Sequence, residues 1–189
     1  MPRLSESGRA ELDDTTLARA RRGEQAACAR FVAVYERRVF AAIGRIAGAR
    51  FGQARVEELA QDAFLRALRA LPRFSPQGPA KLSTWVLTIA TRVALNELRR
   101  AKPPAAPLDE AVASPAPDEH ARFDARRTVR AAVEALTPEQ RAVLVLHDLH
   151  GLTDSEVAHA LDLQVPAVKS RLVRARARLR KALTEQDDG

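Results

Sequence analysis

The chain has 189 residues, a formal net charge of +7 and a pI near 10.6, which favour a nucleic-acid partner over a membrane surface or an acidic substrate. Hydrophobic residues make up 46% of the chain and aromatic residues only 4%, a composition typical of closely packed helices. A single cysteine, Cys28, excludes a disulfide framework and a cysteine-based zinc site. The N-terminus lacks the apolar core of a signal peptide, and no apolar run reaches membrane-spanning length. We therefore expect a cytoplasmic protein that inserts no segment of its own into a membrane.

The first half of the chain predicts a small helical domain. We expect residues 1–14 to form a disordered segment and residues 15–102 to fold, because helical periodicity runs through the latter without a convincing strand. The first folded part is predicted to be a pair of helices interrupted near Gly23. Amphipathic helices follow over residues 56–71 and from Ser83 onward. The last of these carries a predicted polar ridge formed by Thr88, Arg92, Asn96 and Arg99.

A proline-rich segment separates this domain from the rest of the chain. Residues 103–121 hold five of the eleven prolines together with several alanines and acidic residues. This composition predicts a flexible linker. The fold class that we expect is therefore all-α, with two small helical domains joined by this linker.

Residues 122–185 predict a helix-turn-helix domain. Thr137 precedes Gln140 by three residues, and Thr153 precedes Glu156 by the same spacing, so each pair is a candidate capping box. The first helix of the motif is expected from about Thr153 to Leu161. A turn at residues 162–164 has the length that such motifs use, and a second helix begins near residue 165.

The second helix of this motif has two chemically distinct sides. One apolar stripe contains Val168, Leu172, Ala175, Leu179 and Ala182. The opposite side carries Lys169, Ser170, Val173 and Arg174. No acidic residue occurs from Val165 to Leu183, whereas a merely solvated helix face usually mixes charges, so the pattern favours a polyanion. Residues near the start of the helix are expected to reach base edges, and arginines further along to contact phosphates.

Three segments of the chain resemble a known family. They are LAQDAFLRALRALPRF (residues 59–74), STWVLTIATRVALNELRR (residues 83–100) and the helix-turn-helix block from LTPEQRAVLVLHDLHGLTDSEVAHAL to the basic helix (residues 136–183). In this order they are similar to regions of the extracytoplasmic-function sigma factors of bacterial RNA polymerase. The resemblance implies a non-enzymatic subunit that binds core RNA polymerase and directs promoter-specific initiation. It also implies an inhibitory anti-sigma factor as a partner, and no cofactor or metal.

The resemblance assigns residues to three surfaces. The surface that docks on the clamp coiled coil of core polymerase would contain Glu58, Gln61 and Asp62. The surface that recognises and melts the −10 element would contain Phe74, Lys81, Arg92, Asn96, Arg99 and Arg100. The surface that reads the −35 element would contain Lys169, Ser170, Arg171 and Arg174, with Arg176 and Arg178 placed for phosphates.

Some positions depart from the family pattern. Arg92 and Asn96 stand where an asparagine and an aspartate are common, and Asp162 replaces a common glycine in the turn. Promoter preference therefore cannot be carried over from relatives.

Two other classes of protein remain as alternatives. A stand-alone helix-turn-helix activator would use the N-terminal helices for sensing or dimerisation, and it would bind a duplex site tightly without polymerase. An enzyme or metal site is suggested by His147, Asp148 and His150. However, these residues lie at a predicted helix end with no further ligand nearby, so polar residues beside DNA are the favoured interpretation.

Overall fold

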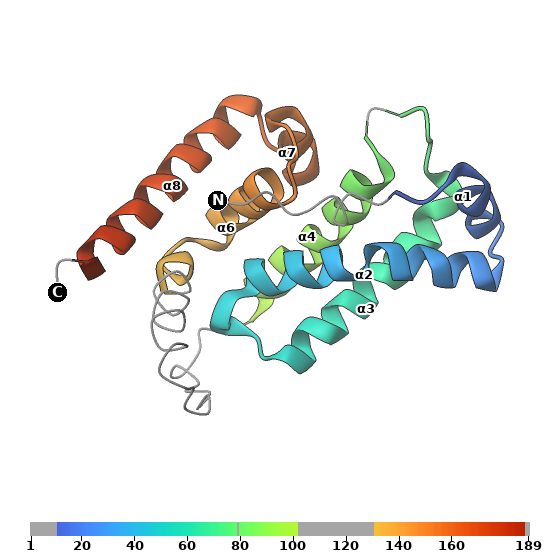
Figure 1. The fold of residues 1–189 in the computed structure, drawn as a ribbon, viewed down its shortest axis with the longest axis horizontal. Coiled ribbons are helices and arrows are strands. Elements are labelled where there is room, and N and C mark those ends of the chain that lie inside the picture. Colours follow the sequence, from blue (N-terminus) through green and yellow to red (C-terminus); the bar gives the residue numbers. More distant parts are fainter. Residues whose placement is uncertain (1–10, 79, 102–130, 188–189) are drawn as a thin grey trace.

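The computed structural model describes residues 11–78, 80–101 and 131–187, and every regular element in these ranges is a helix (Figure 1). The predicted all-α fold is confirmed. The predicted linker, residues 103–121, lies outside the described residues, as do residues 1–10 of the predicted disordered segment. None of the described helices has the length and apolarity needed to span a bilayer.

The N-terminal half is built from four main helices, which are α1 (Asp14–Arg21), α2 (Gln25–Ala47), α3 (Gln53–Ala70) and α4 (Leu82–Arg100). Short 3-10 turns, η2 (Gly48–Arg50) and η3 (Leu71–Arg73), follow α2 and α3. Gly23, at φ 81°, separates α1 from α2 at the predicted break. Leu12 is already buried and donates its backbone N–H to the Tyr35 hydroxyl at 3.2 Å, so the packed part of this half begins before residue 15.

Aromatic side chains form the centre of this half. Phe31 and Tyr35 of α2 are almost fully buried. The Phe31 ring meets Tyr35 and Phe64 edge-on, with centroids 5.3 and 6.4 Å apart, an arrangement that aromatic quadrupoles favour. α4 packs against both α2 and α3, which closes the core.

The C-terminal half contains α6 (Pro138–Leu144), the π-turn η4 (Val145–Leu149), α7 (Asp154–Leu161) and α8 (Val165–Asp187). Both predicted capping boxes, Thr137 with Gln140 and Thr153 with Glu156, are present. Asp162 lies in the left-handed region at φ 55° between α7 and α8, a conformation that aspartate tolerates better than most residues. The helix-turn-helix is therefore built as the sequence predicts.

The two halves pack directly against each other. α2 and α4 contact α6, and α4 also contacts α7. The buried apolar side chains of both halves form one continuous cluster. In Figure 1, α6 lies between α8 and the α2–α4 pair. The sequence predicts two separate domains, and nothing in its local patterns indicates this contact.

The predicted polar ridge is wrong at one position. The prediction places Thr88 at the surface of α4, but its side chain is only 8% exposed. Its hydroxyl donates to the Thr84 carbonyl at 2.8 Å. Thr84 and Thr91 are buried as well. The reason is that α4 is covered on more than one side, by α2 and α3 and by α7. A hydroxyl that bonds to the preceding turn of its own helix can be buried at low cost.

A half-buried histidine, His150, lies where η4 approaches α2. The Nε2 atom of His150 is buried and has no hydrogen-bond partner among the described residues. Burial, together with the nearby positive charges of Arg38 and Arg45, lowers the pKa of His150 from 6.5 to about 4. The folded protein therefore keeps this imidazole neutral at pH values at which the unfolded chain protonates it.

The pKa of His150 makes stability depend on pH. Between pH 7 and pH 5 the unfolded chain takes up a proton that the folded chain does not, so acidification favours unfolding. We expect the wild type to lose about 2 kcal/mol of unfolding free energy over this interval relative to His150→Gln. Urea denaturation of both proteins at several pH values measures the difference. Parallel stability curves would contradict the burial of a neutral imidazole.

Candidate nucleic-acid interface

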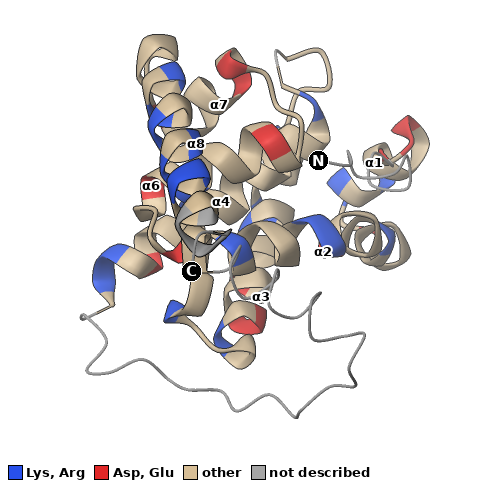
Figure 2. Cartoon of the chain, turned by 60° about the vertical axis from the view of Figure 1, so that its left-hand side comes forward, with Lys and Arg blue, Asp and Glu red and all other residues tan. Residues whose placement is uncertain are grey.

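The orientation of α8 follows from its apolar stripe. Val168, Leu172 and Ala175 are buried against α6 and α7, so the opposite side of the helix faces outward. Lys169 and Arg174 are exposed, whereas Ser170 and Arg171 are half-buried. Figure 2 shows basic residues along most of the length of α8. The predicted base-reading side is thus presented at the surface.

The arginines further along α8 have partners inside the protein. Arg176 donates to both carboxylate oxygens of Asp148, at 3.1 and 2.5 Å, and Arg178 donates to Gln140 at 2.8 Å. Burial raises the pKa of Asp148, but hydrogen bonds from Arg176 and His147 outweigh it and hold that pKa below its usual value. Arg176 therefore joins α8 to η4 with its charge neutralised. The partner of Arg178 is a neutral amide, which leaves its positive charge available for a phosphate.

One exposed apolar side chain interrupts the basic side of α8. Val173 is 65% exposed and lies one turn from Lys169 and next to Arg174. The sequence pattern places Val173 on this side of the helix, but the predicted DNA-binding residues do not include it. Its exposure between basic residues makes it part of the same surface.

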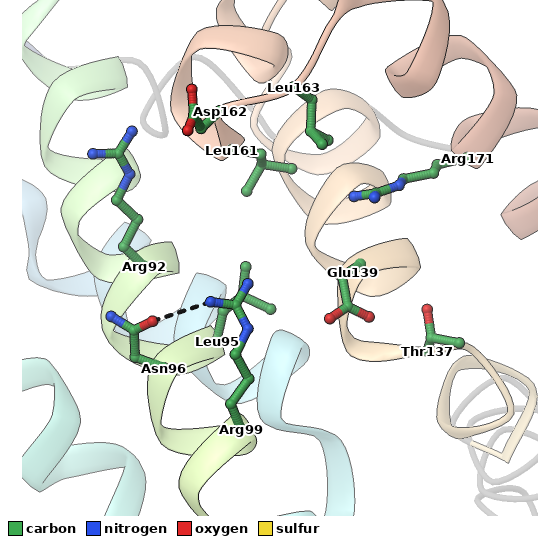
Figure 3. Close-up of a pocket in the computed structure, with 10 residues that line it drawn as sticks. All are labelled: Arg92, Leu95, Asn96, Arg99, Thr137, Glu139, Leu161, Asp162, Leu163 and Arg171. Carbon is green, nitrogen blue, oxygen red and sulfur yellow. Dashed lines mark hydrogen bonds between the residues drawn. The ribbon is translucent and has the colours of Figure 1, made fainter.

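The predicted ridge on α4 lines a cleft with the helix-turn-helix. Arg92, Asn96, Arg99 and Arg100 are exposed, and Arg99 donates to the Asn96 amide oxygen at 3.3 Å. A cleft of about 700 Å³ lies between this ridge and the other half of the protein. Figure 3 shows Arg92, Asn96 and Arg99 on one side of it, with Leu163 and Arg171 on the other. Two surfaces predicted to bind different DNA elements therefore face each other.

In the loop before α4, Phe74 is not exposed in the way that a DNA-contacting residue would be. The Phe74 side chain is only 8% exposed, and its ring lies against Trp85 with centroids 5.2 Å apart. Lys81, at the N-cap of α4, is exposed. The loop therefore presents Lys81 at the surface, while Phe74 supports the core in this arrangement.

The predicted polymerase-binding patch lies on α3. Glu58 and Gln61 are exposed, and Asp62 is half-buried with an ion pair to Arg66 at 2.8 Å. Leu65, one turn further along, is 53% exposed. The predicted patch contains polar residues alone and does not include it. An apolar residue within a polar patch is common at protein–protein interfaces.

Within the predicted cluster at η4, His147 and Asp148 are engaged in polar contacts. His147 pairs with Asp148 at 2.7 Å and with Asp154 at 3.5 Å. Among the described residues, no group of three His, Cys, Asp or Glu side chains is arranged to hold a metal ion. These residues connect η4 with α7 and, through Asp148, with α8.

Comparison with known proteins gives matches in both halves. Residues 31–103 match sigma-70 region 2, and residues 126–179 match sigma-70 region 4. The chain is 36% identical over 137 residues to the ECF RNA polymerase sigma factor SigC of Mycobacterium tuberculosis, which covers 70% of this chain and 71% of SigC. It is 37% identical over 128 residues to SigM of the same species, covering 67% of this chain and 63% of SigM.

The fold agrees with these matches. The structure of CnrH in complex with the cytosolic domain of CnrY is similar to this chain, with a TM-score of 0.66 and 28% identity over 92% of this chain and 97% of CnrH. The regions matched in the two halves, their order along the chain and their helical architecture all indicate the same family. The chain belongs to the extracytoplasmic-function family of RNA polymerase sigma factors.

Proposed function

We propose that this protein binds core RNA polymerase and directs promoter-specific initiation of transcription. The observation that carries the proposal is the outward basic side of α8, held in a helix-turn-helix by Val168, Leu172 and Ala175. A helix of this kind fits the major groove, where a −35 element is read. In vitro transcription with core polymerase on genomic DNA, with mapping of start sites, tests it. Tight, site-specific footprinting by the chain alone would favour a stand-alone activator instead.

The ridge on α4 is proposed to contact the −10 element. Arg92, Arg99 and Arg100 supply positive charge for phosphates, and Asn96 supplies a donor and an acceptor for an unpaired base. Trapping an extruded base biases the melting equilibrium without nucleotide hydrolysis. In this proposal the chain acts by binding alone and carries out no enzymatic step.

A protein inhibitor is the second proposed partner. The similarity to CnrH, whose structure was determined with the cytosolic domain of CnrY, supports an anti-sigma factor for this chain. Such a partner would have to cover the surfaces on α3 or α8, because these are the ones that polymerase and DNA need.

The patch on α3 generates a prediction about polymerase binding. Gln61→Ala with Asp62→Ala should leave folding nearly intact, because Gln61 is exposed and the half-buried Asp62 makes only a surface ion pair with Arg66, and such substitutions usually cost less than about 0.5 kcal/mol each. It should weaken binding to core polymerase by at least about tenfold, a loss of 1.4 kcal/mol or more. Gln25→Ala with Glu36→Ala, at exposed positions on α2, is the matched control. Fluorescence titration with core polymerase measures the affinities. Equal affinities of the two double variants would contradict the assignment of this patch to polymerase binding.

Two arginines of α8 are expected to have different roles on DNA, since Arg174 would recognise bases and Arg178 would contact a phosphate. Arg174→Ala should cost about 1–3 kcal/mol on the cognate −35 element and relax the preference there. Arg178→Ala should weaken binding to all sequences alike and reduce the salt slope by about one unit. Holoenzyme binding to promoters that differ only in the −35 element, at several salt concentrations, distinguishes the two. An equal loss on cognate and scrambled elements with Arg174→Ala would show that this side chain does not read bases.

Val173 is expected to read a thymine. An apolar side chain in the major groove contacts the thymine methyl group, and Val173 is the exposed apolar residue on this side of α8. Replacing one thymine of the −35 element by deoxyuridine should weaken wild-type holoenzyme binding about fourfold, the value of one buried methyl group. Val173→Ala should abolish that sensitivity. A thymine replaced in the spacer is the control, and uniform insensitivity of the wild type across the element would disprove the assignment.

A further inference from the structure

Arg176 lies on the same side of α8 as part of the proposed −35 surface. Lys169, Val173, Arg176 and Arg180 recur at the helical spacing i, i+4, i+7 and i+11, so they form one stripe along the helix. All four side chains are exposed. By its position on the helix, Arg176 would therefore contact a phosphate beside the bases that the start of α8 reads.

The carboxylate of Asp148 instead binds Arg176 through two parallel hydrogen bonds. Nε of Arg176 donates to Oδ2 of Asp148 at 3.1 Å, and Nη2 donates to Oδ1 at 2.5 Å. This is the strong, bidentate geometry of an arginine–carboxylate pair. The side chains are 46% and 35% exposed, respectively, so burial alone does not keep the guanidinium away from solvent.

Asp148 is itself held in place by a neighbouring histidine. Nδ1 of His147 lies 2.7 Å from Oδ1 of Asp148, and Nε2 of His147 lies 3.5 Å from Asp154 at the start of α7. This chain of polar contacts runs from α7 through η4 to α8, and all of it lies within the C-terminal half. If Arg176 turned toward a phosphate, the fixed carboxylate would lose its cation, which has a free-energy cost.

We propose that Asp148 withholds Arg176 from the DNA backbone and thereby sets the number of phosphates that α8 contacts. The proposal rests on the proposed placement of α8 in the major groove. A withheld arginine neutralises no phosphate and releases no counterion, so it adds nothing to the affinity or to its salt dependence.

The consequence is weaker binding to DNA of every sequence. Phosphate contacts carry no sequence information, so Asp148 lowers the affinity for promoter and non-promoter DNA alike, while the residues nearer the start of α8 still read bases. Because a genome offers a large excess of non-specific sites, lower affinity for them leaves more of the chain free to bind core polymerase.

A gain of affinity tests this role of Asp148. Asp148→Asn keeps the size of the side chain and removes its charge, so that Arg176 can turn to a phosphate. Holoenzyme with this variant should bind cognate and scrambled −35 fragments alike about fivefold more tightly at 0.15 M salt. The salt slope should become steeper by about 0.9, the value of one phosphate contact. A merely structural role predicts the opposite, since replacing a structural residue weakens binding.

Two further variants isolate the contribution of Arg176. Asp148→Asn combined with Arg176→Ala should restore the wild-type affinity and salt slope, because the released charge is no longer there. Asp162→Asn removes the same charge from the exposed turn before α8, at φ 55°, which asparagine also tolerates. It should leave the salt slope unchanged. A steeper slope that persists without Arg176, or that Asp162→Asn reproduces, would overturn the proposal.

Arg176→Ala carries the test if Asp148→Asn does not fold. The single variant should keep the wild-type salt slope, because Arg176 makes no phosphate contact to lose, whereas Arg178→Ala lowers the slope by about one unit. A fall of one unit with Arg176→Ala would show that Arg176 already binds a phosphate and would overturn the proposal.

Urea denaturation of the free chain tests the pair without DNA. The wild type, both single variants and the Asp148→Asn, Arg176→Ala double variant form a double-mutant cycle, in which a formed pair gives non-additive losses of stability. Additive losses would overturn the pair itself. If the losses are non-additive but Arg174→Ala holoenzyme binds the cognate −35 element like the wild type, the proposed placement of α8 on DNA is overturned, and the Asp148–Arg176 pair is not.

Discussion

The packing of α4 between the other helices of the N-terminal half and the helices of the C-terminal half is the constraint on which the rest of the structure depends. Its apolar face closes the core with α2 and α3, while α6 and α7 cover another part of its surface. Because α4 is covered in this way, its small polar residues Thr84, Thr88 and Thr91 are buried. Longer side chains further along the helix, from Arg92 to Arg100, reach the cleft or the solvent. The position of the proposed −10 surface is thus a consequence of core packing.

The same logic applies to α8. Burial of an apolar stripe decides which basic residues face outward, because the hydrophobic effect supplies the main driving force and the charges follow. Tertiary partners then divide the arginines into two kinds. Arg176 is neutralised by Asp148 and stabilises the helix in its place, whereas Lys169 and Arg174 remain at the surface. A basic helix is therefore not uniformly available to DNA.

The contact between the halves has a cost in free energy when it is broken. Separating them exposes apolar surface and leaves helix-end carbonyls to water, and both effects have a free-energy cost. A partner that binds the separated form more tightly supplies that free energy and shifts the population.

The sequence by itself determined the features that depend on neighbours along the chain. The break at Gly23, both capping boxes and the outward side of α8 could be predicted, because helical periodicity and capping involve residues three or four positions apart. The sequence could not predict that Phe74 lies in the core against Trp85, nor that Arg176 pairs with Asp148, 28 residues away. It also could not place Arg92 on Ala160, 68 residues away. These contacts depend on how the helices pack in three dimensions, and no local pattern encodes a partner that only the fold brings near.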